Sequence, residues 1–270
     1  MRLRFSPSGA AFFCRNWGNW GNWGQSRFPS QSHSAAATSS PGKSTLTPIP
    51  PIPADLVAED LACRRGERLV FAGVSFRLPP GGALVLIGAN GSGKTSLLRL
   101  LAGLIIPAAG RLAWGATPIA DDAAGHRSRL HYVGHQDGVK PVLTPRETLA
   151  FWASLHGQEL RREAPLLDAA LAAFALEPVA DWPCRWLSAG QRRRLALARL
   201  FVIPAPLWLL DEPIAALDHD NQLRLERAIA EHRAASGRVV LATHIAIEMD
   251  DAAGLVLDAF APAHGDAGEE

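Results

Sequence analysis

The most constraining feature of the sequence is a glycine-rich segment that lies between an apolar run and a helix-like run. Residues 83–87 are all apolar and predict a buried strand, whereas residues 96–101 predict a helix. The segment between them reads G-x-x-x-x-G-K-[ST]. It consists of Gly88, Ala89, Asn90, Gly91, Ser92, Gly93, Lys94 and Thr95, and Ser96 follows it. A strand, a glycine loop and a helix in this order predict a phosphate-binding loop.

The residue types in this loop suit a polyphosphate anion. Glycines let several backbone N–H groups point into one concavity, and the start of the following helix adds the positive end of its dipole. We expect Lys94 to reach the β- and γ-phosphates and the Thr95 hydroxyl to ligate Mg²⁺. The loop therefore predicts a nucleoside triphosphate and Mg²⁺ as ligands.

Composition bounds the other possibilities. A chain of 270 residues, 48% hydrophobic and 20% charged, is typical of one large globular domain or two small ones. Its net charge of +1 argues against a general nucleic-acid binder. Three cysteines without a C-x-x-C pattern suit a reducing compartment and predict neither a disulfide framework nor a zinc site. No apolar run reaches the roughly 18 residues of a bilayer span, so any spanning segments would belong to other chains.

Residues 1–54 have the composition of an unfolded extension. An Asn-Trp-Gly triplet occurs three times in residues 16–24, a Ser/Ala/Gln-rich tract follows, and no acidic side chain is present. Such a segment buries too little apolar surface to offset its chain entropy. We expect a disordered, dispensable tail, which a start site placed too early would also produce. An organelle transit peptide and a secretory signal are the alternative interpretations of its basic composition.

We expect one domain over residues 55–262 and a short tail over residues 263–270. Near-continuous apolar strands alternate with amphipathic helices, which predicts an α/β fold with a parallel sheet covered on both faces. Residues 137–190 are expected to form an all-helical insertion, and Thr144, Pro145 and Glu147 form a capping box at the start of its first helix, with Gly157 as its stop. The expected strands are 69–71, 74–78, 83–87, 111–114, 130–134, 207–210, 239–242 and 255–257. The expected helices include 167–174 and 223–236. Residues 119–129 are expected to be a loop.

Two adjacent carboxylates follow one of these strands. Residues 207–210 are apolar and run directly into Asp211 and Glu212. A carboxylate at the C-terminal edge of a buried strand is suited to hold Mg²⁺, which we expect of Asp211. Glu212 lies one residue further and points to the other side, so we expect it to polarise an attacking water as the general base.

The segment that precedes the expected helix at 192–200 carries a family resemblance. Ser188, Ala189, Gly190 and Gln191 resemble the signature loop of ATP-binding-cassette (ABC) ATPases, with Ala189 where glycine is commoner. The resemblance covers residues 55–260 and implies a P-loop NTPase core, a small antiparallel β subdomain, ATP as ligand and a head-to-tail dimer. In that dimer these four residues of one subunit bind the γ-phosphate held by the other subunit. Arg192, Arg193 and Arg194 lie on different faces of the helix and are interpreted as solvated or structural.

Three further positions match the family. Gln136 resembles the glutamine that senses Mg²⁺ and the attacking water, residues 215–218 resemble the D-loop, and His244 resembles the switch histidine that bonds the γ-phosphate. One position departs from the pattern, because Arg65 stands where many members stack an aromatic side chain on adenine. A guanidinium can also stack on a base.

Within the family, three phrases resemble the ATP-binding subunits of cytochrome c maturation, or haem export, systems. They occupy residues 61–66, 132–140 and 185–191. The resemblance implies an ATPase peripheral to the cytoplasmic face of the bacterial inner membrane, with separate integral membrane subunits as partners. No direct haem ligation is expected of His126, His131 or His135, because no C-x-x-C-H pattern surrounds them. The alternatives are the ATPase of another ABC transporter and a soluble cassette ATPase of cofactor assembly.

Overall fold

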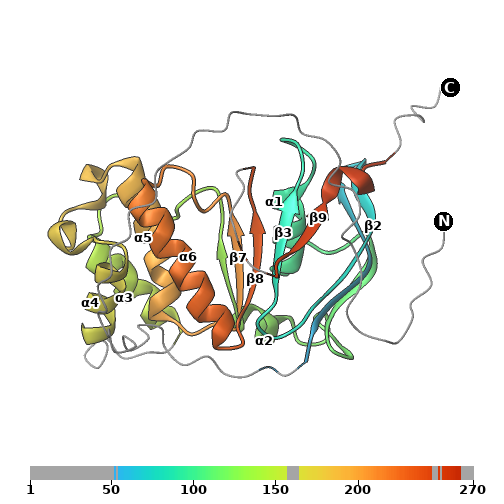
Figure 1. Ribbon diagram of the computed structural model, residues 1–270, viewed down its shortest axis with the longest axis horizontal. Helices are drawn as coiled ribbons and strands as arrows, with labels where there is room; N and C mark the ends of the chain where they lie inside the picture. Colours follow the sequence, from blue (N-terminus) through green and yellow to red (C-terminus); the bar gives the residue numbers. More distant parts are fainter. Residues whose placement is uncertain (1–51, 53, 157–163, 245–248, 250, 263–270) are drawn as a thin grey trace, which may run out of the picture. The chain divides into compact units, whose positions relative to one another are not determined.

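The computed structural model describes residues 52, 54–156, 164–244, 249 and 251–262 (Figure 1). The expectations for residues 1–51, for the tail at 263–270 and for Gly157 lie outside this part of the chain. The strands are β1 (Leu56–Arg65), β2 (Arg68–Leu78), β3 (Ala83–Ile87), β4 (Ala109–Trp114), β5 (Thr117–Pro118), β6 (Leu130–Val133), β7 (Leu207–Asp211), β8 (Arg238–Ala242) and β9 (Ala253–Val256). The helices are α1 (Lys94–Leu101), α2 (Ala123–Ser128), α3 (Pro145–Leu155), α4 (Ala164–Ala173), α5 (Ala189–Val202) and α6 (His219–Ala234), with short 3-10 turns η2 (Glu177–Val179), η3 (Cys184–Trp186) and η4 (Leu257–Phe260).

A five-stranded parallel sheet carries the domain, with the strand order β6-β7-β8-β3-β9. Its central strands are apolar at successive positions because both faces are covered. On β7, Leu207 and Leu209 face one hydrophobic cluster, whereas Trp208 and Leu210 face the other. This confirms the α/β fold with a parallel sheet. It also brings the C-terminal ends of β3, β7 and β8 to one edge, where ligands of such sheets bind.

The antiparallel sheet has the order β2-β1-β4-β5. The sequence predicted two short strands at 69–71 and 74–78, but β2 is one strand of 11 residues that pairs along β1. Register shifts in this pair let the ladder continue past Gly73, which has a φ of 78°. Helix α1 contacts both β1 and the strands β7 and β8, so it lies between the two sheets.

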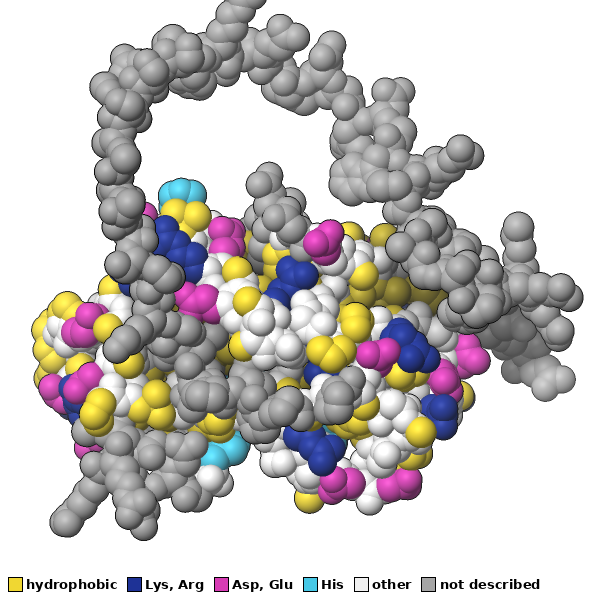
Figure 2. Space-filling view, turned by 60° about the horizontal axis from the view of Figure 1, so that its bottom comes forward, with side chains coloured by type: hydrophobic (Ala, Val, Ile, Leu, Met, Phe, Trp, Pro, Cys, Tyr) yellow, Lys and Arg dark blue, Asp and Glu magenta, His cyan; other side chains and the backbone are white. Residues whose placement is uncertain are grey.

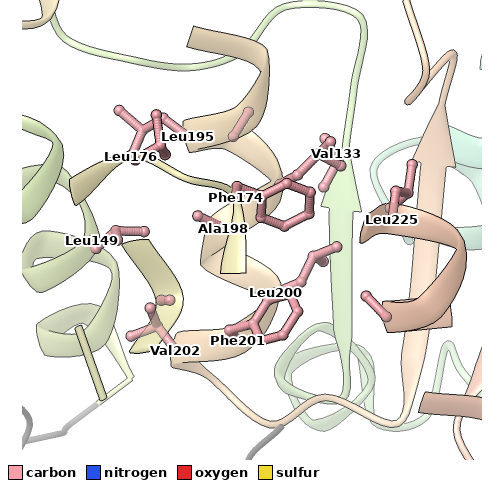
Figure 3. Close-up of a cluster of buried hydrophobic side chains, with 14 of the residues drawn as sticks. Val133, Leu149, Phe174, Leu176, Leu195, Ala198, Leu200, Phe201, Val202 and Leu225 are labelled. Atoms are coloured by element: carbon pink, nitrogen blue, oxygen red, sulfur yellow. The ribbon is translucent and has the colours of Figure 1, made fainter. Parts of the chain in front are cut away.

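The helices α3, α4, α5 and α6 share a second core with the other face of the parallel sheet (Figure 3). Phe174 and Phe201 form its aromatic centre, with ring centroids 5.8 Å apart in an edge-to-face arrangement. Both side chains are buried, so truncation of either to alanine should cost about 3–5 kcal/mol. Figure 3 labels further members of this cluster, which are Val133, Leu149, Leu176, Leu195, Ala198, Leu200, Val202 and Leu225.

Local capping signals set the helix starts in this region. Thr144 caps α3, and its backbone N–H is bonded in return by Glu147, which confirms the predicted capping box. The predicted loop at 119–129 was wrong in part, because α2 occupies residues 123–128. This short helix is stabilised by His126, which is buried and bonds both Trp114 Nε1 and the Leu101 carbonyl.

Positive and negative side chains are interspersed on the face that Figure 2 shows, without a broad area of one sign. This agrees with the near-neutral net charge of the chain. Among the described helices, none combines the length and the apolar composition that a membrane span requires.

Candidate active site

A cavity of about 780 Å³ lies at the C-terminal edge of the parallel sheet. It is lined by the glycine loop after β3, the start of α1, the end of β7 and His244, which follows β8 by two positions. Its lining residues are Arg65, Arg68, Leu69, Val70, Ala89, Asn90, Gly91, Ser92, Gly93, Lys94, Thr95, Ser96, His135, Asp211, Glu212, Ala215, His244, Asp258, Ala261 and Pro262. The structure therefore gathers into one cavity most of the residues that the sequence assigned to the nucleotide and to catalysis.

The glycine loop is packed too tightly for larger residues at its two ends. Gly93 caps α1 with a φ of 104°, and a Cβ there would lie 2.7 Å from Val70 Cγ1. A Cβ on Gly88 would lie 2.6 Å from Ser92 Oγ. Lys94 donates from Nζ to the Gly88 and Ala89 carbonyl oxygens at 2.6 and 3.0 Å, which places its ammonium group inside the loop. The loop is thus a closely packed cradle that holds one cation, which suits a phosphate chain.

Asp211 is buried at the end of β7 beside this cradle. Burial raises the pKa of Asp211 above its ordinary value of 3.8, and the charge of Glu212 adds to the rise, whereas a hydrogen bond from Thr95 opposes it. Asp211 Oδ2 is buried without a hydrogen-bond partner among the described residues. An unpaired carboxylate oxygen next to a threonine hydroxyl is a donor set that fits a hard cation such as Mg²⁺.

Glu212 and His244 meet across the adjacent strands β7 and β8. His244 Nδ1 lies 2.8 Å from Glu212 Oε2, and the Glu212 side chain is mostly buried whereas that of His244 is exposed. Glu212 has a φ of 49°, a left-handed conformation that is uncommon for a non-glycine residue. Its backbone N–H donates to the Ala242 carbonyl at 2.8 Å. The carboxylate therefore faces the cavity from a strained and well-bonded backbone position.

Gln136 is placed differently from the other predicted residues. It is exposed after β6 and does not line the cavity, whereas its neighbour His135 does. From the sequence, His135 was considered only as a haem ligand, and its position beside Asp211 and Glu212 was not predicted. Of the other two histidines considered with it, His126 and His131 are both buried in the interior, and His131 bonds the Ile203 carbonyl at 2.8 Å.

The signature segment lies outside the lining of this cavity. Ser188 caps α5, because its hydroxyl accepts from the Gln191 N–H and its own N–H donates to the Gln191 side chain. Gly190 packs against the D-loop segment at 215–218, where a Cβ would lie 2.8 Å from the Ala216 carbonyl oxygen. The structure thus brings the signature helix next to the D-loop, and Ala215 of that segment lines the cavity.

The three arginines after the signature are structural, as one of the two interpretations predicted. Arg192 bonds the Leu187 carbonyl, and Arg194 bonds the carbonyls of Phe174 and Ala175. Arg193 is buried and reaches the end of β7, where the carboxylates lie. The sequence offered no signal for this difference, because three consecutive arginines look alike until their helix is placed.

Two further features of the cavity concern its rim. Arg65 lines it together with Arg68, and none of the described lining residues is Phe, Tyr or Trp. The guanidinium group of Arg65 therefore occupies the position where many family members have an aromatic residue, and Arg68 adds a second guanidinium group to the lining. Asp258, which the sequence did not single out, accepts a hydrogen bond from the Ala89 N–H at 3.1 Å. Its carboxylate fastens the start of the glycine loop to the 3-10 turn η4.

Comparison with known proteins identifies the family. The family model for ABC transporters matches residues 71–215, which is more than half of the chain. The chain belongs to the ABC transporter ATPase family. Members of this family hydrolyse ATP, so the chain is an ABC-type ATPase.

Curated relatives cover most of this ABC ATPase. The chain is 58% identical over 214 residues to the cytochrome c biogenesis ATP-binding export protein CcmA of Rhodospirillum rubrum, which covers 79% of this chain and 90% of that protein. It is 48% identical over 193 residues to the CcmA of Pseudomonas putida, covering 72% and 90% of the two chains.

Solved structures of ABC ATPases share the fold. The ATP-binding subunit of an ABC transporter superposes with a TM-score of 0.64 at 26% identity, covering 71% of this chain and 80% of that one. A putative ABC transporter ATP-binding protein from Pyrococcus furiosus gives a TM-score of 0.67 at 22% identity, covering 77% and 100%. These likenesses agree with the two sheets and the helical segment described above.

Proposed function

We propose that this ABC ATPase is the ATP-hydrolysing subunit of a membrane complex that serves export in cytochrome c biogenesis. The observation that carries the proposal is the 58% identity to a CcmA protein, which extends over 90% of that relative. The family model matches residues 71–215, a range that includes the glycine loop, both carboxylates and the signature segment. The activity energises the handling or export of haem for c-type cytochromes.

The cavity residues divide the work of hydrolysis. The glycine loop, Lys94 and Ser96 hold the phosphate chain. Thr95 and Asp211 in the cavity, together with Gln136 from outside its lining, would hold Mg²⁺. When bound, this ion neutralises charge on the β- and γ-phosphates. Glu212 takes a proton from the attacking water, and His244 steadies that carboxylate and bonds the γ-phosphate.

The second half of each nucleotide site comes from another copy of the chain. Ser188, Ala189, Gly190 and Gln191 begin a helix of 14 residues, and a helix start favours an anion. These residues do not line the cavity of their own chain. In the proposed head-to-tail dimer, they bind the γ-phosphate that the partner's glycine loop holds.

The partners of this subunit include integral membrane chains of the transporter. The ATPase lies peripherally at the cytoplasmic face of the inner membrane. Residues 55–262 form its catalytic domain and residues 137–190 form a helical subdomain within it. Residues 1–54 are an extension that is dispensable for ATP hydrolysis and complex formation, and residues 263–270 are a short tail.

The proposal is tested by complementation in Rhodospirillum rubrum cells that lack their own CcmA. The intact chain should restore c-type cytochromes, measured as haem covalently attached to protein in membrane extracts. Lys94→Ala should not restore them, whereas Arg127→Ala, a change at an exposed position on α2, should. Affinity purification from the restored membranes should yield the spanning chains. An active ATPase that neither restores cytochromes nor copurifies with membrane chains would contradict the proposal.

A further inference from the structure

The Arg193 side chain of α5 is buried and uses every donor of its guanidinium group. Nη2 donates to the carbonyl oxygens of Asp211 and Glu212 at 2.6 and 2.7 Å, and Nε reaches the Pro213 carbonyl at 3.4 Å. Nη1 donates to the Gly134 carbonyl at 2.8 Å and to Asp137 Oδ1 at 3.3 Å. An arginine has five N–H donors in a rigid plane, and all of them are engaged here.

These acceptors belong to two segments that border the cavity. Three successive carbonyls, from Asp211 to Pro213, turn toward the same cation at the end of β7. The other two acceptors flank His135 and Gln136, at the end of β6. Arg193 itself lies five residues after Ser188, so one side chain links the signature helix to both segments.

Arg193 bonds the backbone of Glu212, which is in a strained conformation. Glu212 has a φ of 49°, and a non-glycine residue keeps such a conformation only where its surroundings enforce it. Its N–H is fixed by the Ala242 carbonyl of β8, and its C=O is fixed by Arg193. Loss of the second contact would let the peptide after Glu212 rotate and would change the direction of its carboxylate.

We propose that Arg193 is a positioning residue for hydrolysis, which holds the Glu212 carboxylate in its catalytic direction and ties it to the signature helix. The proposal rests on the proposed role of Glu212 as the general base. Arg193 does not line the cavity, so it acts through Glu212 and leaves ATP binding intact.

Arg194 provides a matched control. It lies next to Arg193 on the same helix and also donates to two backbone carbonyls, those of Phe174 and Ala175. Those carbonyls belong to the helical region and not to the cavity. Replacement of Arg194 removes a similar set of contacts from the same helix without touching the β7 end.

The test is a double-mutant cycle on ATP hydrolysis by the full chain, with Arg193→Gln, Glu212→Gln and the double variant. Arg193→Gln should lower kcat by about 10–100-fold, the scale for loss of an orienting partner, with an unchanged Kd for ATP. In the Glu212→Gln background, the same change should lower the residual rate by less than about 2-fold, because residues that act as a unit are not additive. Arg194→Gln should have the same small effect in both backgrounds.

The outcomes separate this proposal from the proposed function. Equal losses from Arg193→Gln in both backgrounds, or a loss confined to ATP affinity, would overturn the positioning role while Glu212 keeps its own. Near-normal turnover by Glu212→Gln alone would overturn the general base itself. If Arg193→Gln does not fold, Arg193→Lys or Asp137→Ala can replace it in the double-mutant cycle, because each keeps some of the hydrogen bonds around residue 193. Wild-type kcat in folded Arg193→Lys would also refute the proposal.

Discussion

His244 Nδ1 lies 2.8 Å from Glu212 Oε2, and the two residues follow adjacent strands of the parallel sheet. Their contact is possible because β7 and β8 are parallel and in register, so both strands end at the same edge of the sheet. Asp211 pairs with Ala242 at that edge, which sets Glu212 and His244 one and two residues beyond it. The sheet therefore places the proposed base and its histidine partner by topology.

Glu212→Gln should slow ATP hydrolysis by at least about 100-fold, because an amide cannot accept the proton of the attacking water. The variant should still bind ATP, since the glycine loop and Lys94 are unchanged. Phosphate release measures the rate, and nucleotide retention on the protein measures binding. Glu226→Gln, on the adjacent helix α6, is the control and should hydrolyse ATP normally. Near-normal turnover by Glu212→Gln would remove this residue from the role of base.

Asp211→Asn should raise the Mg²⁺ concentration that half-activates hydrolysis by at least about 10-fold, given the scale of metal-site substitutions. The physical reason is the unpaired Oδ2 atom, which an amide cannot replace as an anionic ligand. Titration of ATPase activity with Mg²⁺ measures the effect. Asp220→Asn, at an exposed position in the first turn of α6, is the matched control. An unchanged Mg²⁺ requirement in Asp211→Asn would exclude Asp211 from the proposed metal site.

Mixing two inactive variants should restore activity if Ser188 acts on the partner's nucleotide. Lys94→Ala removes the phosphate lysine, and Ser188→Arg blocks the signature, so neither variant alone has a complete site. A mixed head-to-tail dimer has one complete site, and the mixture should recover no more than roughly half of wild-type activity. Continuous ATPase assays during titration of one variant with the other measure the recovery. Absence of any recovery would indicate that both residues serve the same chain's site.

Much of the site could be predicted because its signals are local. The glycine loop is contiguous, Asp211 and Glu212 directly follow an apolar strand, and the capping box of α3 spans four residues. The features that escaped prediction depend on distant contacts. Helix α2 is held by the bonds of His126 to Trp114 and Leu101, and neither partner is near it in sequence.

The arginines illustrate the same limit. The chemistry of Arg193 is identical to that of Arg192 and Arg194, and only the placement of α5 against β7 sets it apart. Likewise, the alternation of residues around Gly73 could not show that β2 continues, because the continuity comes from the pairing of β1. Residue type and spacing predict which chemical groups a segment carries, whereas tertiary contacts decide which of several identical side chains reaches the site.

Acid should destabilise the fold through two buried histidines. Burial lowers the pKa of His131 and of His232 from the ordinary value of 6.5 to about 3. Between pH 6.5 and about pH 3, these histidines bind protons in the unfolded chain but not in the folded chain. The stability that is present above pH 6.5 is therefore lost as the pH falls toward 3. From pH 7 to pH 5, each histidine should cost about 2 kcal/mol of unfolding free energy.

Urea unfolding at several pH values measures this loss. His131→Gln should flatten the pH dependence, because its amide can still donate to the Ile203 carbonyl but does not titrate in this range. His219→Gln, at an exposed position at the start of α6, should leave the slope unchanged. An equal slope in His131→Gln and in the unaltered chain would show that folding does not lower the pKa of His131.

A shortened chain should be more stable when it keeps Ile52 than when it begins at Asp55. Arg238 is fully buried at the start of β8, and its Nη2 donates to the carbonyl oxygens of Ile52 and Ala54 at 2.9 and 2.6 Å. A start at Asp55 removes both acceptors and leaves part of a buried cation unpaired, which costs on the order of 1–3 kcal/mol. Thermal unfolding of chains that begin at residues 48 and 55 measures the difference, and ATPase activity should persist in both at temperatures where they are folded. Equal unfolding temperatures would show that water replaces these carbonyls. Loss of ATPase activity in the folded chain that begins at Asp55 would overturn the expectation that residues 1–54 are dispensable.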